Sequence, residues 1–303
     1  MSDSITIAHA GSLIQVLTQD LGPAFTKQTS YTWTSIAGPA VGLANQIRSG
    51  ALTPDVYLSA DAEVNQVLIG PQHGDLVRWF AVLTGTRMVL AYSPNSRFKA
   101  DLDAAAAGQA QWIDVLQSPN FVFRRSDPRN NPGGYRTVFV FQLAERFYRR
   151  VGLSAQILHS HDNEGQIGSM GTIQGLANGT VDAIMMYVTS ALDFGLPYIQ
   201  LPDAIDLSNP AFAADYRTAR YTNPLGQTFY GTPVVYSITI PTAAQNPTGA
   251  AAFAAFALSD VGRTIFQNNG FLAADALFGG DIDAVPESLR HRFRGTYTSP
   301  TIG

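Results

Sequence analysis

Residues 126–136, with the sequence SDPRNNPGGYR, stand between two segments of opposite character. Residues 121–123 (FVF) are aromatic and β-branched, which is typical of a strand. Residues 137–148 (TVFVFQLAERFY) carry an apolar face and predict a helix. The prolines and glycines between them predict a tight turn that leaves backbone N–H groups unpaired. Such a turn can bind an anion at the carboxyl edge of a parallel sheet, although an ordinary strand-to-helix loop has the same composition.

The same order of strand, small polar turn and helix recurs three times in the first third of the chain. The strands are expected at residues 5–8, 31–34 and 55–61. Ser12 follows the first strand at the position of a helix N-cap, and Gly50 ends the second helix. This repetition predicts an α/β layer whose loops gather at one edge of a parallel sheet.

A second α/β unit is expected from about residue 85 to residue 202. Its strand signals lie at residues 87–94 and 181–187, and its helices at 101–111 and 171–178. A loop-rich section follows, and then a strand at 234–241 and one helix that continues from residue 250 to 270. A tail rich in proline and glycine ends the chain.

The composition narrows the function classes. The 303 residues are 46% hydrophobic, enough for two domains, and the net charge of −4 without a basic run argues against nucleic acid as a partner. Cysteine is absent, which removes thiol catalysis, cysteine-ligated zinc and disulfides. No Gly-X-Ser-X-Gly, Walker or Rossmann motif occurs, and Glu145, Glu164 and Asp182 show no pairing that suggests acid/base catalysis.

Six motifs in sequence resemble a known family. They are HAGSL at 9–13, PDVYLSAD at 54–61, MVLAY at 88–92, SDP at 126–128 with GYR at 134–136, GTVD at 179–182, and YSITIP at 236–241. Together they resemble the periplasmic tungstate/molybdate-binding proteins of ABC importers. The resemblance implies an α/β, two-lobed type 2 periplasmic-binding-protein fold, in which each lobe is a mixed, mostly parallel sheet flanked by helices and the ligand cleft lies between the lobes. Residues 1–84 and 203–303 would form lobe I, and residues 85–202 lobe II.

The resemblance also implies the function. The protein would capture tungstate or molybdate through backbone N–H and side-chain hydroxyl donors, deliver it to an ABC-transporter permease, and need no cofactor. We expect a monomer that is exported to the periplasm or the cell exterior, free or membrane-anchored, with the signal peptide absent from this sequence. Two alternatives stay open: a binding protein for sulfate or a small organic acid, and an enzyme built on the same fold.

The candidate ligand-binding residues follow from the turns and the resemblance. They are Gly11, Ser12, Ala40, Val41, Ser59, Asn131, Gly133, Gly134, Tyr187 and Ser190. The Ser12 hydroxyl could instead serve only its own helix. Ala40 and Val41 offer backbone N–H groups where the family usually carries a hydroxyl, and Ser35 is the nearest alternative. Tyr187 is as compatible with packing as with binding.

Four arginines, at positions 124, 125, 129 and 136, flank the central stretch, and we expect at most one of them to bind the ligand while others are solvated or paired with Asp127. His161 and Asp162, with His159, form a short HSHD run that predicts an exposed loop rather than a metal site.

Archaeal members of the resembled family add two protein carboxylates to the metal. The aligned residues here are Asn131 and Met186, which cannot supply an anionic oxygen. The sequence therefore predicts that a bound ion stays tetrahedral and is held by hydrogen bonds.

Overall fold

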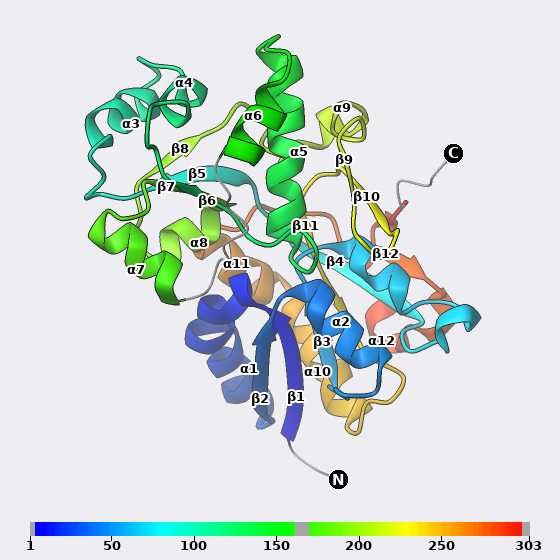
Figure 1. Ribbon diagram of the computed structural model, residues 1–303. Coiled ribbons are helices and arrows are strands. Elements are labelled where there is room, and N and C mark those ends of the chain that lie inside the picture. The colour runs from blue at the N-terminus through cyan, green and yellow to red at the C-terminus, as the bar shows by residue number, and fades with distance from the viewer. Residues whose placement is uncertain (1–3, 161–169, 299–303) are drawn as a thin grey trace. The chain divides into compact units, whose positions relative to one another are not determined.

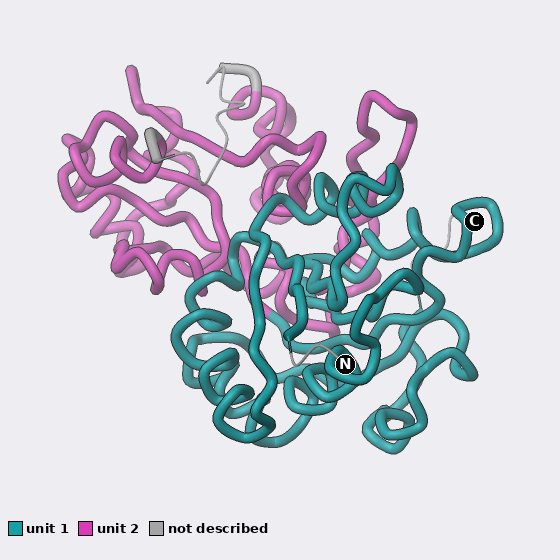
Figure 2. Tube along the Cα trace, turned by 90° about the horizontal axis from the view of Figure 1, so that it is seen from below, with its two compact units in different colours: residues 1–85, 234–303 teal, residues 86–233 magenta. Residues whose placement is uncertain are grey.

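The computed structural model of the protein describes residues 4–160 and 170–298 (Figure 1). The chain forms two compact units: unit 1 comprises residues 1–85 and 234–303, and unit 2 comprises residues 86–233 (Figure 2). The chain therefore passes from one unit to the other twice. Within the described residues, no helix is long and apolar enough to cross a membrane.

Unit 1 is built on one mixed sheet. Its strands, in spatial order, are β13 (Gly295–Thr296), β12 (Leu277–Gly280), β4 (Trp79–Gly85), β11 (Val235–Thr239), β3 (Val56–Ser59), β1 (Ser4–Ala10) and β2 (Thr32–Gly38). Its α-helices are α1 (Gly22–Thr29), α2 (Ala40–Arg48), α10 (Pro247–Ala257), α11 (Asp260–Asn268) and α12 (Glu287–Arg290). Shorter 3₁₀ and π-helical turns are Gly11–Leu13, Val16–Leu21, Ala62–Val67, Pro71–His73 and Ile282–Ala284. The fully buried Phe25 of α1 packs edge-on against Phe253 of α10, with 5.1 Å between ring centroids.

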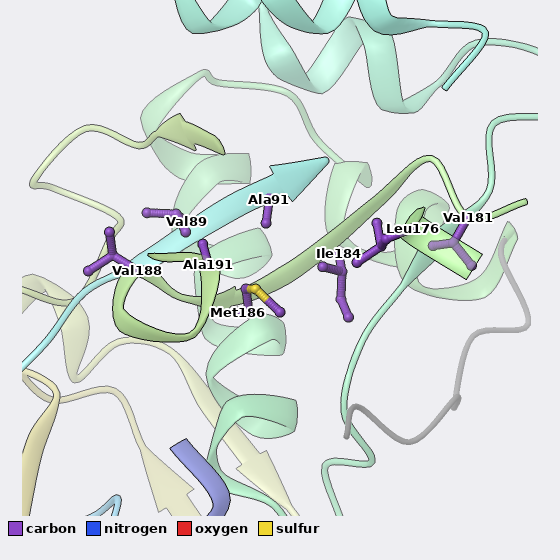
Figure 3. Close-up of a cluster of buried hydrophobic side chains, with 8 residues drawn as sticks. All are labelled: Val89, Ala91, Leu176, Val181, Ile184, Met186, Val188 and Ala191. Carbon is purple, nitrogen blue, oxygen red and sulfur yellow. The ribbon is translucent and has the colours of Figure 1, made fainter. Parts of the chain in front are cut away.

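Unit 2 contains a smaller sheet and a hairpin. The sheet has the order β6 (Phe123–Arg124), β7 (Ala183–Tyr187), β5 (Met88–Tyr92) and β8 (Tyr198–Gln200), and the hairpin pairs β9 (Arg220–Thr222) with β10 (Thr228–Tyr230). Its helices are α3 (Lys99–Ala106), α4 (Trp112–Leu116), α5 (Pro132–Phe147), α6 (Leu153–Ser160), α7 (Met170–Asn178), α8 (Val188–Asp193) and α9 (Ala213–Tyr216), with a 3₁₀ turn at Pro210–Phe212. Figure 3 shows one apolar cluster of this unit, formed by Val89, Ala91, Leu176, Val181, Ile184, Met186, Val188 and Ala191.

Asp182 fixes the entry of β7. Its carboxylate, which is buried, accepts hydrogen bonds from the Ser96 hydroxyl at 2.6 Å and from the Val122 N–H at 2.7 Å. One side chain thereby joins the turn after β5 to the start of β6, and a buried carboxylate with these partners has a structural role.

Residues 203–233 belong to unit 2, whereas the sequence placed them in the first lobe. They pack against α5: the Gln142 side chain accepts the Arg220 N–H at 2.9 Å, and Tyr135 stacks on Phe229 with 4.4 Å between ring centroids. The sequence of this loop-rich segment gave no sign of which helix it would contact.

The sheets are mixed, but parallel pairs do not dominate either of them. In unit 1, β1 is parallel to both β2 and β3, whereas β11 is antiparallel to both β3 and β4. In unit 2, β6 is parallel to β7, and β5 is antiparallel to β7 and β8. β11, β12 and β13 in unit 1 and β5 in unit 2 run against the direction of the strand-to-helix repeats, which accounts for the difference.

The helix expected over residues 250–270 is two helices. α10 ends at Ala257 and α11 begins at Asp260. Ser259 lies between them in extended geometry, and its hydroxyl accepts the Gly262 N–H at 3.2 Å. This serine N-cap starts a new helix where the apolar periodicity alone predicted continuation.

Candidate functional site

Three strand-to-helix turns of unit 1 end at one edge of its sheet. β2, β1 and β3 are adjacent and parallel, with Ala10 opposite Gly38 and His9 opposite Leu58. Each of these strands runs into a helical turn, which begins at Gly11, Ala40 or Ala62. The carboxyl edge of parallel strands is the place where α/β proteins bind ligands, so this edge is the candidate site of unit 1.

The first turn begins two residues earlier than the sequence indicated. Ala10, not Ser12, is the N-cap, because the 3₁₀ turn starts at Gly11 and Ala10 keeps extended geometry. Ser12 is half-buried in the turn, and its Oγ accepts a hydrogen bond from the Tyr236 hydroxyl at 2.9 Å. Gly11 is exposed, and an added Cβ there would meet nothing within 4 Å among the described residues. The backbone of this turn is therefore accessible.

Tyr236 is a residue of this edge that the sequence did not single out. It stands near the start of β11, whose next residue, Ser237, lies opposite Ser59 at the end of β3. The antiparallel direction of β11 brings its beginning to the edge where β1 and β3 end. Ser12 and Tyr236 are 224 positions apart, so no local pattern could have paired them.

The second turn offers backbone only. Ala40 and Val41 are buried as the first two residues of α2, behind the N-cap Pro39, which makes no side-chain capping bond. Their N–H groups have no partner inside the helix. Ser35 does not replace them, because it lies within β2 opposite Ile7, outside the turn.

Ser59 uses its hydroxyl within its own turn. The hydroxyl donates to the Asp61 carbonyl at 2.7 Å and accepts the Asp61 N–H at 3.2 Å. Asp61 in turn caps the following 3₁₀ turn by accepting the Glu63 N–H. The structure thus gives the Ser59 side chain a local role in shaping the edge.

His9 is fully buried two residues before the first turn. Its Nδ1 lies 2.9 Å from the Ala10 carbonyl oxygen, and its Nε2 has no hydrogen-bond partner among the described residues. Burial lowers the pKa of His9, against the opposing effect of the Ala10 hydrogen bond. The imidazole is accordingly neutral near pH 7 and adds no positive charge to this edge.

The candidate site of unit 2 lies at the carboxyl edge of its parallel strands. β6 and β7 are parallel, with Phe123 opposite Ala183, and each strand is followed by a helix. β6 leads through residues 125–131 into α5, and β7 leads directly into α8. A hydrogen bond joins the two: Arg136 of α5 donates from Nη1 to the Tyr187 hydroxyl at 2.6 Å.

The N–H groups at the start of α5 have partners, contrary to the expectation from the sequence. Asn131 is the N-cap: its Oδ1 accepts the Gly133 N–H at 2.9 Å, and its carbonyl accepts the Gly134 N–H at 2.9 Å. These two N–H groups are therefore engaged within the turn itself. Sequence composition could not distinguish this self-capped turn from an open one.

Asp127 and Arg129 form an ion pair in the same loop. The guanidinium of Arg129 contacts both carboxylate oxygens, at 2.7 to 3.0 Å, and its backbone N–H donates to Oδ1. Burial by itself would raise the pKa of Asp127, but the hydrogen bonds and charge of Arg129, with Arg125 nearby, hold that pKa below its ordinary value. Arg129 therefore serves the loop, as the sequence suggested for most of these arginines.

The remaining unit 2 candidates surround the end of β7. Tyr187 is the last residue of β7 and the N-cap of α8, with a 6% exposed side chain. Ser190 is half-buried in the first turn of α8. The sequence overlooked Thr189, which is fully buried and whose hydroxyl has no hydrogen-bond partner in the described part of the chain.

Residues 4–160 and 170–298 contain no group of three or more histidine, aspartate or glutamate side chains placed to hold a metal ion. His161 and Asp162 of the HSHD run lie outside the described residues.

Residues 5–272 match the family model described as bacterial extracellular solute-binding protein. The chain belongs to this family. A solute-binding protein of Petrotoga mobilis is 30% identical over 97% of this chain and 91% of its own length. The molybdate/tungstate-binding protein of Pyrococcus abyssi is 28% identical over 94% of this chain and 88% of its own. A putative ABC transporter molybdenum-binding protein of Haloferax volcanii is 30% identical over 78% and 72%.

Solved structures confirm the fold of this solute-binding protein. The periplasmic molybdate-binding protein of Azotobacter vinelandii has a TM-score of 0.60 at 17% identity and covers 89% of this chain and 100% of its own. The sulfate-binding protein of Mycobacterium tuberculosis has a TM-score of 0.57 at 13% identity and covers 88% and 86%. The fold is the two-lobed fold of periplasmic binding proteins.

In the first turn of α5, position 134 leaves no room for a side chain. A Cβ atom there would lie 2.5 Å from the Asp127 carbonyl carbon and 2.6 Å from the Ser126 carbonyl oxygen, which are backbone atoms. We expect Gly134→Ala to lower the free energy of unfolding by about 1–3 kcal/mol through overpacking.

The matched control is Gly133→Ala, whose Cβ would have Asn131 Oδ1 at 3.3 Å as its nearest neighbour. Urea denaturation of both variants measures the difference. Equal midpoints would show that the loop relaxes away from residue 134.

Proposed function

We propose that this solute-binding protein is the substrate-binding component of an ABC importer, that its ligand is molybdate or tungstate, and that it is not an enzyme. The proposal rests on the carboxyl edge of strands β1 and β2 in unit 1. Two helical turns begin there without side-chain caps, at Ala10 and Pro39, and they follow adjacent strands. Their backbone N–H groups and the Ser12 hydroxyl are neutral donors. The names of the archaeal relatives support the choice of ion.

The donor chemistry supports this choice as well. A tetrahedral oxyanion accepts several hydrogen bonds, and helix N-termini favour negative charge without bringing a counterion. We propose that a permease receives the bound anion. Because the donors are fixed by the fold, they can replace the hydration shell of the ion without reorganising.

A binding panel tests the proposal. Molybdate and tungstate at about 100 times their Kd should stabilise the protein by about 2.7 kcal/mol in a thermal-unfolding assay. Phosphate, vanadate and small organic acids should give smaller shifts at the same concentration. Sulfate is the main rival, since a sulfate-binding protein has the same fold. A larger stabilisation by sulfate than by tungstate would show that the protein is a sulfate-binding protein. Chemical conversion of any of these ligands would show that it is an enzyme.

The Ser12 hydroxyl should contribute directly to binding. Ser12→Ala should weaken tungstate binding by about 1–3 kcal/mol, the cost of removing a hydroxyl donor to a charged group, and the fold should persist. Isothermal titration calorimetry measures the affinity.

Tyr236→Phe is the control, because it removes the partner of Ser12 and keeps the Ser12 hydroxyl. Its effect should stay within about 1 kcal/mol, that of one neutral hydrogen bond. If Ser12→Ala binds tungstate as tightly as the parent, the first turn is not part of the site.

The bound ion should stay tetrahedral. Met186, aligned with one carboxylate of the archaeal proteins, lies in the apolar cluster of Figure 3, and the Asn131 oxygen, aligned with the other, caps α5. A buried thioether and an engaged amide are poor ligands for a high-valent metal. X-ray absorption at the tungsten edge should report four oxygen neighbours. Six neighbours would mean that another carboxylate reaches the metal.

A further inference from the structure

Arg136 is the most deeply buried arginine of the central stretch, with a side chain 1% exposed. It projects from α5 toward the end of β7, where Nη1 donates to the Tyr187 hydroxyl at 2.6 Å. The guanidinium carbon also lies 5.7 Å from the Tyr187 ring centroid and 6.0 Å from that of Tyr135. Burying a cation is costly, so a deeply buried arginine must be held by specific contacts such as these.

The direction of this hydrogen bond follows from chemistry. A guanidinium carries donors only, so the Tyr187 oxygen must be the acceptor. The phenol hydrogen of Tyr187 is then directed away from Arg136. A hydroxyl that accepts from a cation is polarised and becomes a stronger donor, because consecutive hydrogen bonds reinforce one another.

Several other polar groups of the unit 2 edge are engaged within their own loop, whereas the start of α8, where Tyr187 stands, has no side-chain cap. The N–H groups of Gly133 and Gly134 are bonded to Asn131, and the cation of Arg129 is paired with Asp127. Tyr187 stands where β7 ends and α8 begins, at the same sheet edge. The hydrogen bond from Arg136 restrains the orientation of the Tyr187 hydroxyl.

We propose that Arg136 is a positioning residue for oxyanion binding: it acts through Tyr187, whose hydroxyl it orients and polarises toward the ligand. This inference rests on the proposed function. It differs from a bidentate arginine clamp, in which the guanidinium itself would contact the anion.

A double-mutant cycle with tungstate tests the inference. Calorimetric Kd values are measured for the parent, Arg136→Gln, Tyr187→Phe and the double variant, together with their unfolding midpoints without ligand. Each single change should weaken binding by about 10- to 100-fold. In the Tyr187→Phe background, Arg136→Gln should add less than about twofold, because its partner is already gone.

The matched control is Arg146→Gln. Arg146 lies on the same helix but is exposed and contacts Thr218, so its loss should leave the Kd unchanged. A merely structural role of Arg136 would lower the unfolding midpoint without producing coupling in the Kd. If Arg136→Gln does not fold, Arg136→Lys replaces it in the cycle, because it keeps the charge and one donor.

A ring-fluorinated tyrosine at position 187 gives a second readout without changing Arg136. Fluorine makes the phenol a stronger donor and a weaker acceptor, so tungstate should bind a few times more tightly at a pH where the phenol stays protonated. Weaker binding would overturn the donor role of Tyr187. Additive effects of the two substitutions on the Kd would overturn only the positioning role of Arg136. Failure of the parent protein to bind tungstate would overturn the proposed function, and this inference with it.

Discussion

A helix cannot bond the N–H groups of its own first turn, and the candidate turns of this protein meet that constraint in different ways. In unit 1, within the described residues, the caps Ala10 and Pro39 make no side-chain bond to the helices that follow them. In unit 2, Asn131 accepts the N–H groups of both Gly133 and Gly134. The turns that follow β1 and β2 therefore offer backbone dipoles, whereas the first turn of α5 is closed by its own Asn131.

The strand-to-helix repeats were predictable because each is a local pattern. Parallel β1, β2 and β3, with helical turns at their carboxyl ends, follow from periodicity and from small residues such as Gly11 and Gly38. The placement of residues 203–233 on unit 2 and the break at Ser259 were not predictable from periodicity. The first depends on contacts across long sequence distances, and the second on one capping side chain within a continuous apolar pattern.

The same distinction between local patterns and long-range contacts applies to the candidate site. The turns were found from sequence, but the use of each polar group was not, because hydrogen-bond partners are set by tertiary structure. The Asn131 side chain proved to cap its own helix, and Ser59 bonds its own turn. Four similar arginines acquired different environments: Arg129 is bound to Asp127, and Arg136 is buried against Tyr187. Burial and partner, rather than residue type, distinguish them.

Under the proposed function, selectivity must come from distance rather than charge. Molybdate, tungstate and sulfate all carry two negative charges near neutral pH, so helix dipoles and a buried guanidinium attract them alike. Discrimination by size requires donors that do not follow a smaller ion inward. Two hydroxyls of this chain are held by a second residue: Ser12 by Tyr236 in unit 1, and Tyr187 by Arg136 in unit 2. Each partner restrains the rotation of the donor it holds, and that restraint converts a difference in ionic radius into a difference in binding free energy.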